Sequence, residues 1–310
     1  MKFQGVPGKC AVTLMLIWTM AALLDVLPCC ADVCFIHDYT MNEYVVGEKD
    51  AELSECYSGN SKAVDKTTRY TDTLLKRWFG GVKSFKATTQ ILLDQDVIRE
   101  LDYAKNKTID FPLKKITDPA WYDRYTPDDI PESTREHLDK RYAAVDPEFD
   151  VQVDPEPVLL NGYSCRHVVA LLRLETRDKK RNASSITLVR QEVWVSEDVP
   201  GYDEYQAFHR KLVDRLGIDA ERIGVFASLL DYWQGPLDRF RDALGDVQGY
   251  PVHKEVSVTA VYRADSPSGD PVTTQKEISA IKETLRSVSR DPVPSERFAS
   301  PPEFSQVIAE

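Results

Sequence analysis

The chain has 310 residues, of which 42% are hydrophobic and 29% charged, the composition of an ordinary globular protein that can bury a substantial core. Its formal net charge is −11 at pH 7. This balance disfavours nucleic acids and anionic lipid head groups as partners, because both require basic patches.

The N-terminus carries the pattern of a secretory signal peptide. Two lysines precede an apolar run from Cys10 to Leu24, which is too short for a comfortable membrane span. We expect cleavage after Ala31, so that residues 1–31 are a signal peptide and residues 32–310 are exported, to the periplasm or the extracellular space. An uncleaved membrane anchor and lipidation of a cysteine near the cleavage site are the alternatives.

Three cysteines remain after this cleavage: Cys34, Cys56 and Cys165. In an exported protein, three cysteines favour one disulfide and one free thiol. A Cys34–Cys56 bond would close a local loop, but the sequence leaves the pairing open. Cys165 lies in the middle of an expected strand, where a cysteine is often a small buried hydrophobe.

The N-terminal third predicts strands separated by polar connections. We expect a strand from Phe35 to Val46 and a long polar loop over residues 47–66, while residues 70–79 suit either a strand or a short helix. A meander of three strands then follows at Ser84–Leu93, Asp96–Tyr103 and Thr108–Leu113.

The composition changes over residues 114–157, where prolines and acidic residues are frequent. One helix is expected within this stretch, from Glu132 to Ala144, with Pro131 at its start. We interpret the stretch as a Pro-rich, acidic insertion that lies on the surface of one domain spanning 32–310, and not as a domain of its own.

The centre of the chain predicts a β-hairpin. Asn161-Gly162 is a strong turn signal, and two runs rich in Val, Ile and Leu follow, from Tyr163 to Leu174 and from Ile186 to Val195. Both runs carry apolar residues on both faces. Such strands are covered on both sides or line an apolar concavity.

An amphipathic helix is expected directly after this hairpin. Its apolar residues recur at spacings of three and four, which places them on one stripe: Tyr205, Phe208, Leu212 and Leu216. Acidic residues in the first turn and Gly217 after the last suit the helix dipole and a left-handed cap.

The C-terminal third predicts two helices, two further extended segments and a tail. The helices are expected at 221–233 and 237–244, and a strand at 252–263 forms a hairpin with the segment that begins at Val272. Ile278, Ile281 and Leu285 are spaced for a helix in that segment, although a strand stays open. Residues 292–310 are Pro-rich and are expected to lie extended on the surface.

Together these elements predict an α+β fold. The expected architecture is a curved antiparallel half-barrel sheet with the helices packed on its concave face.

Five short motifs follow one another along the chain. They are Leu101-Asp102-Tyr103, Asn161-Gly162-Tyr163-Ser164-Cys165, the stretch from Glu192 to Tyr202, Gly249-Tyr250-Pro251-Val252, and Phe298 ahead of Pro301-Pro302. In this order the chain resembles, over about Phe35 to Val307, the exported domains of unknown function related to the periplasmic lipoprotein carriers. The resemblance implies a half-barrel sheet closed by helices, whose concave face holds acyl chains in the carriers.

No motif for catalysis, a metal or a cofactor is found. None of the five histidines has metal-ligand spacing to another histidine or cysteine, and the sequence contains no nucleophile elbow, phosphate loop or dinucleotide fingerprint. His209 is expected to be exposed on the helix. Cys165 and His167 share one face of an expected strand, as a thiol–imidazole pair would, but positions this close on one strand rarely supply a nucleophile and its base. We therefore predict no catalytic residue, no metal ligand, no cofactor and no enzymatic activity.

The aromatic and aliphatic side chains of the centre suggest a ligand site instead. The candidate ligand-binding residues are Val169, Leu171, Trp194, Tyr205 and Phe208. The predicted function is binding of an apolar ligand, an acyl chain or lipoprotein anchor, in the concavity of the sheet; lipid or a lipoprotein is the expected partner, and any membrane contact would be made through the ligand or the N-terminus. The alternative is a structural or interaction module of the cell envelope whose core is filled by its own side chains.

Overall fold

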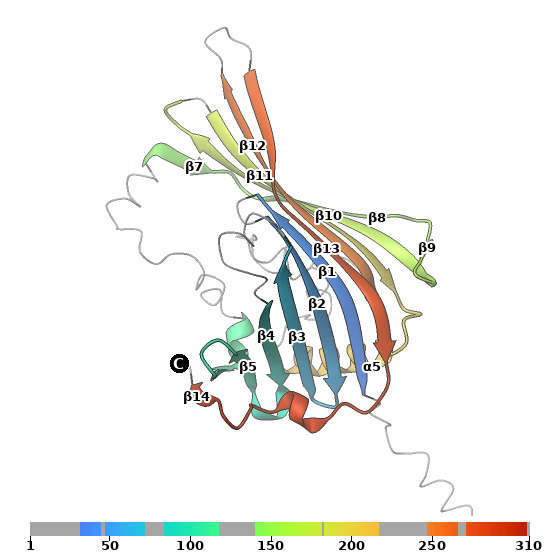
Figure 1. The fold of residues 1–310 in the computed structure, drawn as a ribbon. Coiled ribbons are helices and arrows are strands. Elements are labelled where there is room, and N and C mark those ends of the chain that lie inside the picture. Colours follow the sequence, from blue (N-terminus) through green and yellow to red (C-terminus); the bar gives the residue numbers. More distant parts are fainter. Residues whose placement is uncertain are drawn as a thin grey trace, which may run out of the picture.

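A single long, strongly curved sheet dominates the molecule (Figure 1). The computed structural model describes residues 32–44, 47–71, 84–117, 140–181, 183–216, 247–265 and 271–308. The signal peptide expected at 1–31 and the helices expected at 221–233 and 237–244 lie outside these ranges, as does most of the segment 70–79.

The described elements are fourteen strands, one α-helix and three short 3₁₀ helices. They are β1 (Val33–Glu43), β2 (Gly47–Ser58), β3 (Ser61–Tyr70), β4 (Ser84–Leu92), η1 (Leu93–Gln95), β5 (Val97–Asp102), β6 (Lys107–Pro112), η2 (Leu113–Thr117), β7 (Tyr142–Ala144), β8 (Glu148–Val153), β9 (Val158–Leu160), β10 (Tyr163–Asp178), β11 (Ala183–Ser196), α5 (Tyr202–Leu216), β12 (Tyr250–Asp265), β13 (Pro271–Ser289), η3 (Ser295–Phe298) and β14 (Ser305–Ile308).

The sheet order is β14-β6-β5-β4-β3-β2-β1-β13-β12-β11-β10-β7, with β8 and β9 also paired to β10. All pairs are antiparallel except β14, which joins β6 in parallel. Strand β1 therefore connects an N-terminal meander on one side with the long C-terminal strands on the other (Figure 1). Because β1 pairs with β13, the first and last long strands of the domain close the two halves into one sheet.

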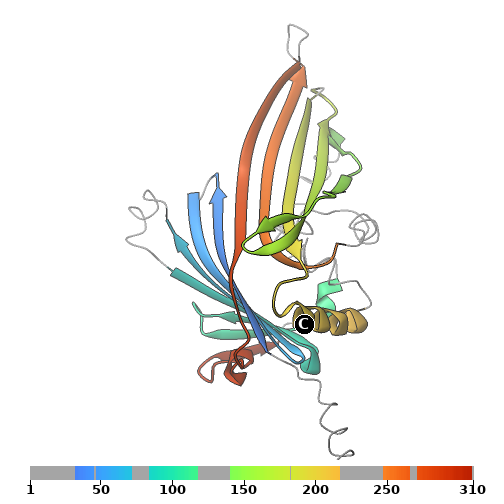
Figure 2. The ribbon, with the colours of Figure 1, turned by 90° about the vertical axis from the view of Figure 1, so that its right-hand side faces the viewer.

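The predicted α+β class is wrong. Of the described residues, 66% lie in strands and 13% in helices, and the single α-helix in these ranges is α5. A curved antiparallel sheet was expected, as was a group of helices on its concave face. Within the described ranges, α5 is the one α-helix on that face (Figure 2).

The expected polar loop over residues 47–66 is also wrong, because this stretch forms β2 and most of β3. The alternation of apolar and polar residues is weak in this stretch because charged side chains occupy inner-face positions, where they pair with charged side chains of the neighbouring strand. Lys62 on β3, for example, forms an ion pair with Glu55 on β2. Two glycines lie at the ends of β2: Gly47 begins the strand, and Gly59 lies in the turn to β3.

The strongest local signals are confirmed. Asn161 and Gly162 have φ angles of 52° and 85°, as a turn between β9 and β10 requires, and β10 pairs with β11 as the expected hairpin. The meander is β4 to β6, and the helix runs from Tyr202 to Leu216.

Three other expectations changed. The segment after Val272 is the strand β13, the alternative that the sequence had left open. Its apolar residues show helix-like spacing because register shifts at Val258/Thr259 and Ile36/His37 interrupt the strict alternation. Within the expected helix 132–144, the end Tyr142–Ala144 is strand β7. The C-terminal tail contributes η3 and β14, so it is not wholly extended on the surface.

The C-terminal segment covers part of the outer, convex face. The guanidinium of Arg297 donates to Ser54 Oγ and Asp65 Oδ2, both at 2.7 Å, and Gln90 Nε2 donates to the carbonyl of Arg297 at 2.9 Å. Gln306 reaches Asp110 in the same way, at 2.9 Å. These bonds tie the end of the chain to β2, β3, β4 and β6.

The core consists of two apolar clusters. The first, which we call the aromatic cluster, gathers α5 with β1, β2, η1 and the start of β12. Its buried members are Val33, Phe35, Tyr57, Leu93, Ile98, Leu113, Cys165, Val199, Tyr202, Tyr205, Phe208, Leu212, Tyr250, Val252 and Leu285.

The second cluster, which we call the valine cluster, belongs to β10, β11 and β12. Its buried members are Val168, Ala170, Leu172, Val189, Val193, Val195, Val247, Val256 and Val258. No residue of α5 belongs to it.

The disulfide is Cys34–Cys56, between directly paired residues of β1 and β2, and Cys165 is free and buried. This settles the pairing that the sequence left open. The bond crosses the sheet at the end where the aromatic cluster lies, so it ties the first strand of the domain to its neighbour.

Gly249 permits a close approach of two strands and provides a test of this packing. Its φ is +118°, and a Cβ at this position would lie 2.8 Å from the backbone nitrogen of Ser196. Gly249→Ala should therefore lower the free energy of unfolding by at least about 1 kcal/mol more than Gly162→Ala, because Gly162 also has a positive φ, +85°, but open space around its Cβ position. Urea denaturation of both variants measures the difference. Equal losses would mean that the Ser196 backbone gives way.

Candidate functional site

A largely buried carboxylate, that of Glu55, whose side chain is 15% exposed, lies on the face of the sheet that carries α5, which we call the inner face. Tyr57 donates its hydroxyl proton to Glu55 Oε1 at 2.8 Å, and Tyr250 donates to Oε2 at 2.9 Å. The ammonium of Lys62 forms an ion pair with Oε1. Three donors from β2, β3 and β12 therefore converge on one anion.

Two buried histidines extend this arrangement. Nε2 of His37 lies 2.7 Å from the Tyr250 hydroxyl, and Nε2 of His209 lies 3.3 Å from the Tyr57 hydroxyl. Tyr57 gives its one proton to Glu55, so the His209 imidazole donates from Nε2 to the Tyr57 oxygen. His37 contacts the Tyr250 hydroxyl through Nε2 and the carboxylate of Glu283 through Nδ1, and a neutral ring donates to one of these two oxygens. We call Glu55, Tyr57, Lys62, Tyr250, His37 and His209 the Glu55 cluster.

Burial and charge set the protonation states of the cluster. Burial alone would raise the pKa of Glu55, but the charge and hydrogen bond of Lys62 and the hydrogen bond of Tyr57 outweigh it and bring that pKa to about 2. Burial lowers the pKa of His209 to about 3, and it lowers that of His37 against the opposing charge of Glu283. Burial raises the pKa values of both tyrosines. At neutral pH the cluster is thus one carboxylate, one ammonium, two neutral imidazoles and two phenols.

Strand alternation and aromatic packing place these groups. Phe35 and His37 face inward on β1, and the ring of Phe35 stacks on that of Tyr250 with centroids 3.8 Å apart. The Tyr57 ring meets Tyr205 and Phe208 of α5 edge to face, at 5.7 and 5.4 Å. The aromatic cluster therefore orients the phenols that hold Glu55.

A second carboxylate, Glu283 on β13, lies next to the cluster. Lys254 Nζ is 2.6 Å from its Oε2, and His37 Nδ1 is 3.3 Å from its Oε1. Burial would raise the pKa of Glu283, but the charge of Lys254 brings it below the ordinary value. The centre of the inner face is therefore charged and internally paired.

Beyond Lys254 the inner face becomes apolar. Directly paired residues lie on the same face of a sheet, and the pairs run from Glu283 to Lys254, from Lys254 to Val193, and from Val193 to Val168. The valine cluster thus begins one strand away from the ion pair. It extends along β10 to Leu174, six residues or roughly 20 Å from Val168.

A pocket of about 600 Å³ lies at the far end of the valine cluster. Leu174, which packs against the cluster, forms part of its wall together with Thr187 opposite. The other wall comes from β7 and the residues that follow it, including Val145 and Pro147. Its volume is in the range of small-molecule sites.

The five residues predicted to bind a ligand do not meet in one place. Tyr205 and Phe208 are buried in the aromatic cluster, and Trp194 packs against that cluster half-buried. Val169 and Leu171 alternate with the buried residues of β10 and therefore point to the outer face, where Leu171 is 39% exposed. The residues on either side of Leu171, Ala170 and Leu172, face inward and belong to the valine cluster.

Trp194 is instead part of an aromatic stack with two histidines. Its ring lies 4.3 Å from that of His167, nearly parallel, and 5.1 Å from that of His253. His167 contacts the carboxylate of Asp154 at 2.6 Å and that of Glu192 at 3.1 Å.

The prediction that His209 is exposed is wrong, since this residue is only 4% exposed. The helix buries two adjacent positions, Phe208 and His209, because the apolar stripe of α5 meets Tyr57 on one flank. Its Nδ1 has no hydrogen-bond partner among the described residues. The imidazole is therefore held by packing and by one bond through Nε2.

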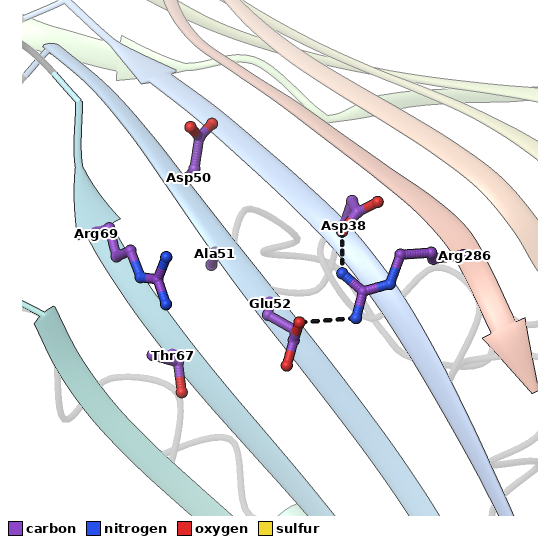
Figure 3. Close-up of a pocket in the computed structure, with 7 residues that line it drawn as sticks. All are labelled: Asp38, Asp50, Ala51, Glu52, Thr67, Arg69 and Arg286. Carbon is purple, nitrogen blue, oxygen red and sulfur yellow. Dashed lines mark hydrogen bonds and ion pairs between the residues drawn. The ribbon is translucent and has the colours of Figure 1, made fainter. Parts of the chain in front are cut away.

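A further pocket, of about 310 Å³, lies on the outer face and is polar (Figure 3). Arg286 bridges Asp38 and Glu52, at 2.9 and 2.7 Å, across three strands. Arg69 and Asp50 complete the charged part of its wall. Three carboxylates and two arginines line this pocket, which the sheet separates from the inner face.

No group of three or more metal-ligating side chains lies within the described ranges. Of the helices that the structure describes, none combines the length and the hydropathy needed to cross a bilayer. The thiol of Cys165 donates to the carbonyl of Tyr163 at 3.5 Å, and burial raises its pKa, so the thiol is protonated at neutral pH.

The sequence did not reveal the Glu55 cluster, whose members are spread from residue 37 to residue 250. His37 was only one of five histidines without metal-ligand spacing, and Glu55 fell in the stretch expected to be a loop. One signal was present: the alternation of Leu53, Glu55 and Tyr57 places a carboxylate between two apolar side chains on one face.

Tyr250→Phe tests whether the phenols hold Glu55. The variant keeps the ring that stacks on Phe35 but removes one donor from a buried carboxylate, so we expect the free energy of unfolding to fall by about 1–3 kcal/mol. Tyr262→Phe, at a residue that is 49% exposed, is the control and should change little. Urea denaturation at pH 7 measures both. A Tyr250→Phe protein as stable as the control would contradict the assigned role.

The buried neutral His209 predicts an acid-sensitive stability. Its pKa is lowered in the folded state, so its contribution is full above the ordinary value of 6.5 and is lost as the pH falls toward about 3. Glu55 adds a further loss between about pH 4.5 and 2. His209→Gln should therefore flatten the decline of stability below pH 6.5 by up to about 1.4 kcal/mol per pH unit. Denaturation curves from pH 8 to 4.5 measure this, and slopes that stay parallel to those of the wild type below pH 6.5 would refute it.

No protein-family model matches the chain, and no curated protein sequence matches it either. A solved structure with some similarity is that of a DUF1329 family protein from Desulfovibrio piger, at 10% sequence identity and a TM-score of 0.21, over 92% of this chain and 96% of that chain. The relation to the lipoprotein carriers is not shown by this comparison. At this TM-score it carries no argument about the fold or the activity of this chain.

Proposed function

We propose that this chain is an exported, non-enzymatic protein that binds an apolar ligand, an acyl chain or a lipoprotein anchor, along the valine cluster. The observation that carries the proposal is the division of the inner face. Around Glu55 and Glu283 it is charged and paired, whereas along β10 to β12 it carries buried, mainly apolar side chains over about 20 Å, with Gln191 as a buried polar residue among them.

The helix and the pocket support this placement. The described helix α5 packs on the aromatic cluster and contributes nothing to the valine cluster. The 600 Å³ pocket lies where the valine cluster ends at Leu174, and it would be the entrance for a chain. Each methylene moved from water to an apolar wall gains about 0.8 kcal/mol, so binding requires no catalytic group.

Export is supported by the N-terminal pattern and by the Cys34–Cys56 bond, since disulfides persist in oxidising compartments. The resemblance to the lipoprotein carriers enters the proposal only here, as the reason for naming lipoprotein anchors among the ligands.

The alternative, a module of the cell envelope with a self-filled core, is favoured by one observation. Val168, Ala170, Leu172, Val189 and Val193 are all 0% exposed. A core that is already filled needs no ligand. The two functions differ in whether the protein carries lipid when it is isolated.

Native mass spectrometry of the exported protein, purified without detergent, tests the proposal. We expect adducts with the mass of a lipid, which organic extraction removes and added lipid restores. Leu174→Arg places a charge in the pocket wall and should abolish the adducts, whereas Leu171→Arg, three residues away on the outer face, should retain them. A protein that is free of adducts and takes up no lipid would favour the self-filled module. Adducts that survive Leu174→Arg but not Leu171→Arg would move the site to the outer face.

A further inference from the structure

The lysines of β2, β3 and β12 are matched with carboxylates in all cases but one. Lys62 pairs with Glu55, Lys254 pairs with Glu283 at 2.6 Å, and Lys49 pairs with Glu43, also at 2.6 Å. The fourth, Lys66, has no carboxylate within ion-pair distance in the part of the chain that the structure describes.

Lys66 nevertheless lies at the charged centre of the inner face. It is directly paired with Leu53, which is paired in turn with His37, so all three residues share that face. Its Nζ lies 3.8 Å above the centroid of the Tyr39 ring. Burial lowers the pKa of Lys66, the charge of Glu283 opposes this shift, and the charge of Lys254 adds to it, so these charges are near neighbours.

A half-buried ammonium beside a second ammonium is costly to leave without an anion. The Tyr39 ring offers a cation–π contact, which restores only part of the lost hydration. Since the protein supplies a carboxylate to every other lysine of these strands, the unmatched charge is a place where a ligand can supply one.

We infer that Lys66 is an anion-binding residue, and that the ligand of the valine cluster is an anionic amphiphile whose carboxylate or phosphate contacts the Lys66 ammonium. The inference rests on the proposed function and specifies its ligand class. The paired sequence from Val168 and Val193 to Lys254 and Glu283 makes the apolar and charged parts of the inner face continuous, as a molecule with an apolar chain and an anionic head would require.

Calorimetric titration of the delipidated protein with dodecanoic acid and with methyl dodecanoate separates the head group from the chain. We expect the wild type to bind the acid about tenfold more tightly than the ester at pH 7.5, a difference typical of one charge-assisted contact. Lys66→Met should remove this preference by weakening the acid alone. Lys66→Arg should retain it, and so should the matched control Lys49→Met, which removes an inner-face lysine that already has a partner.

The outcomes distinguish the inference from the function on which it rests. If neither compound binds, the proposed function fails. If acid and ester bind equally well to the wild type, or if Lys66→Met retains the preference, the function stands and the anion site is wrong. Dodecyl phosphate and sodium acetate complete the series: tight binding of the phosphate extends the site to lipid phosphates, and acetate that binds as tightly as dodecanoic acid would overturn the assignment to an amphiphile.

The pH dependence of the wild type provides a measurement that needs no variant. Because the pKa of Lys66 is lowered, its ammonium is lost below pH 10.5 as the solution becomes alkaline. The affinity for dodecanoic acid should then fall toward that of the ester between pH 8 and 10.5, while the affinity for the ester stays constant. A preference for the acid that is unchanged over this range would refute the role of Lys66.

Discussion

The burial of the Glu55 carboxylate is the constraint on which the inner face depends. An ion removed from water costs several kcal/mol unless it is paired and hydrogen-bonded. Its donors are Tyr57, Lys62 and Tyr250, which come from β2, β3 and β12. Glu55 can therefore be buried only when strands from both halves of the sheet are in place, so its solvation links the N-terminal meander to the C-terminal strands.

The same constraint positions the helix. Tyr57 must present its hydroxyl to Glu55 while its ring is buried, and the rings of Tyr205 and Phe208 on α5 supply the surface that covers it. His209, the next residue along α5, bonds to the hydroxyl from the other side. A helix that is held at the aromatic end of the sheet cannot also cover β10 and β11, which explains why α5 is absent from the valine cluster.

Local patterns predicted the parts of the fold that depend on neighbouring residues. Asn161-Gly162 predicted its turn, and the apolar stripe predicted α5 almost to the residue, because turn geometry and helical spacing are local. The strands β2 and β3 were missed because charged and polar residues interrupt their apolar alternation, and the sequence does not show that some of them, such as Lys62 and Glu55, pair between strands. Within the site, Tyr205 and Phe208, predicted to bind a ligand, lie buried in the aromatic cluster. Alternation alone could not tell which face of β10 the sheet would bury. Val169 and Leu171 were chosen over Val168 and Leu172 for that reason.

The net charge of −11 and an anionic ligand are compatible because carboxylates of the outer face are paired with arginines of the same face. On the outer face, Asp38 and Glu52 are neutralised by Arg286, and exposed charges elsewhere are screened within about 8 Å at physiological ionic strength. The overall charge therefore slows the approach of an anion more than it weakens the bound state. The affinity for the ligand is decided on the inner face, where Lys66 is partly buried. Among the lysines of β2, β3 and β12, Lys66 is the one that has no carboxylate partner among the described residues. The acidic composition argued against basic patches. It could not predict one lysine without a carboxylate partner, because β2 and most of β3, which place Lys66 on the inner face, were expected to be a loop.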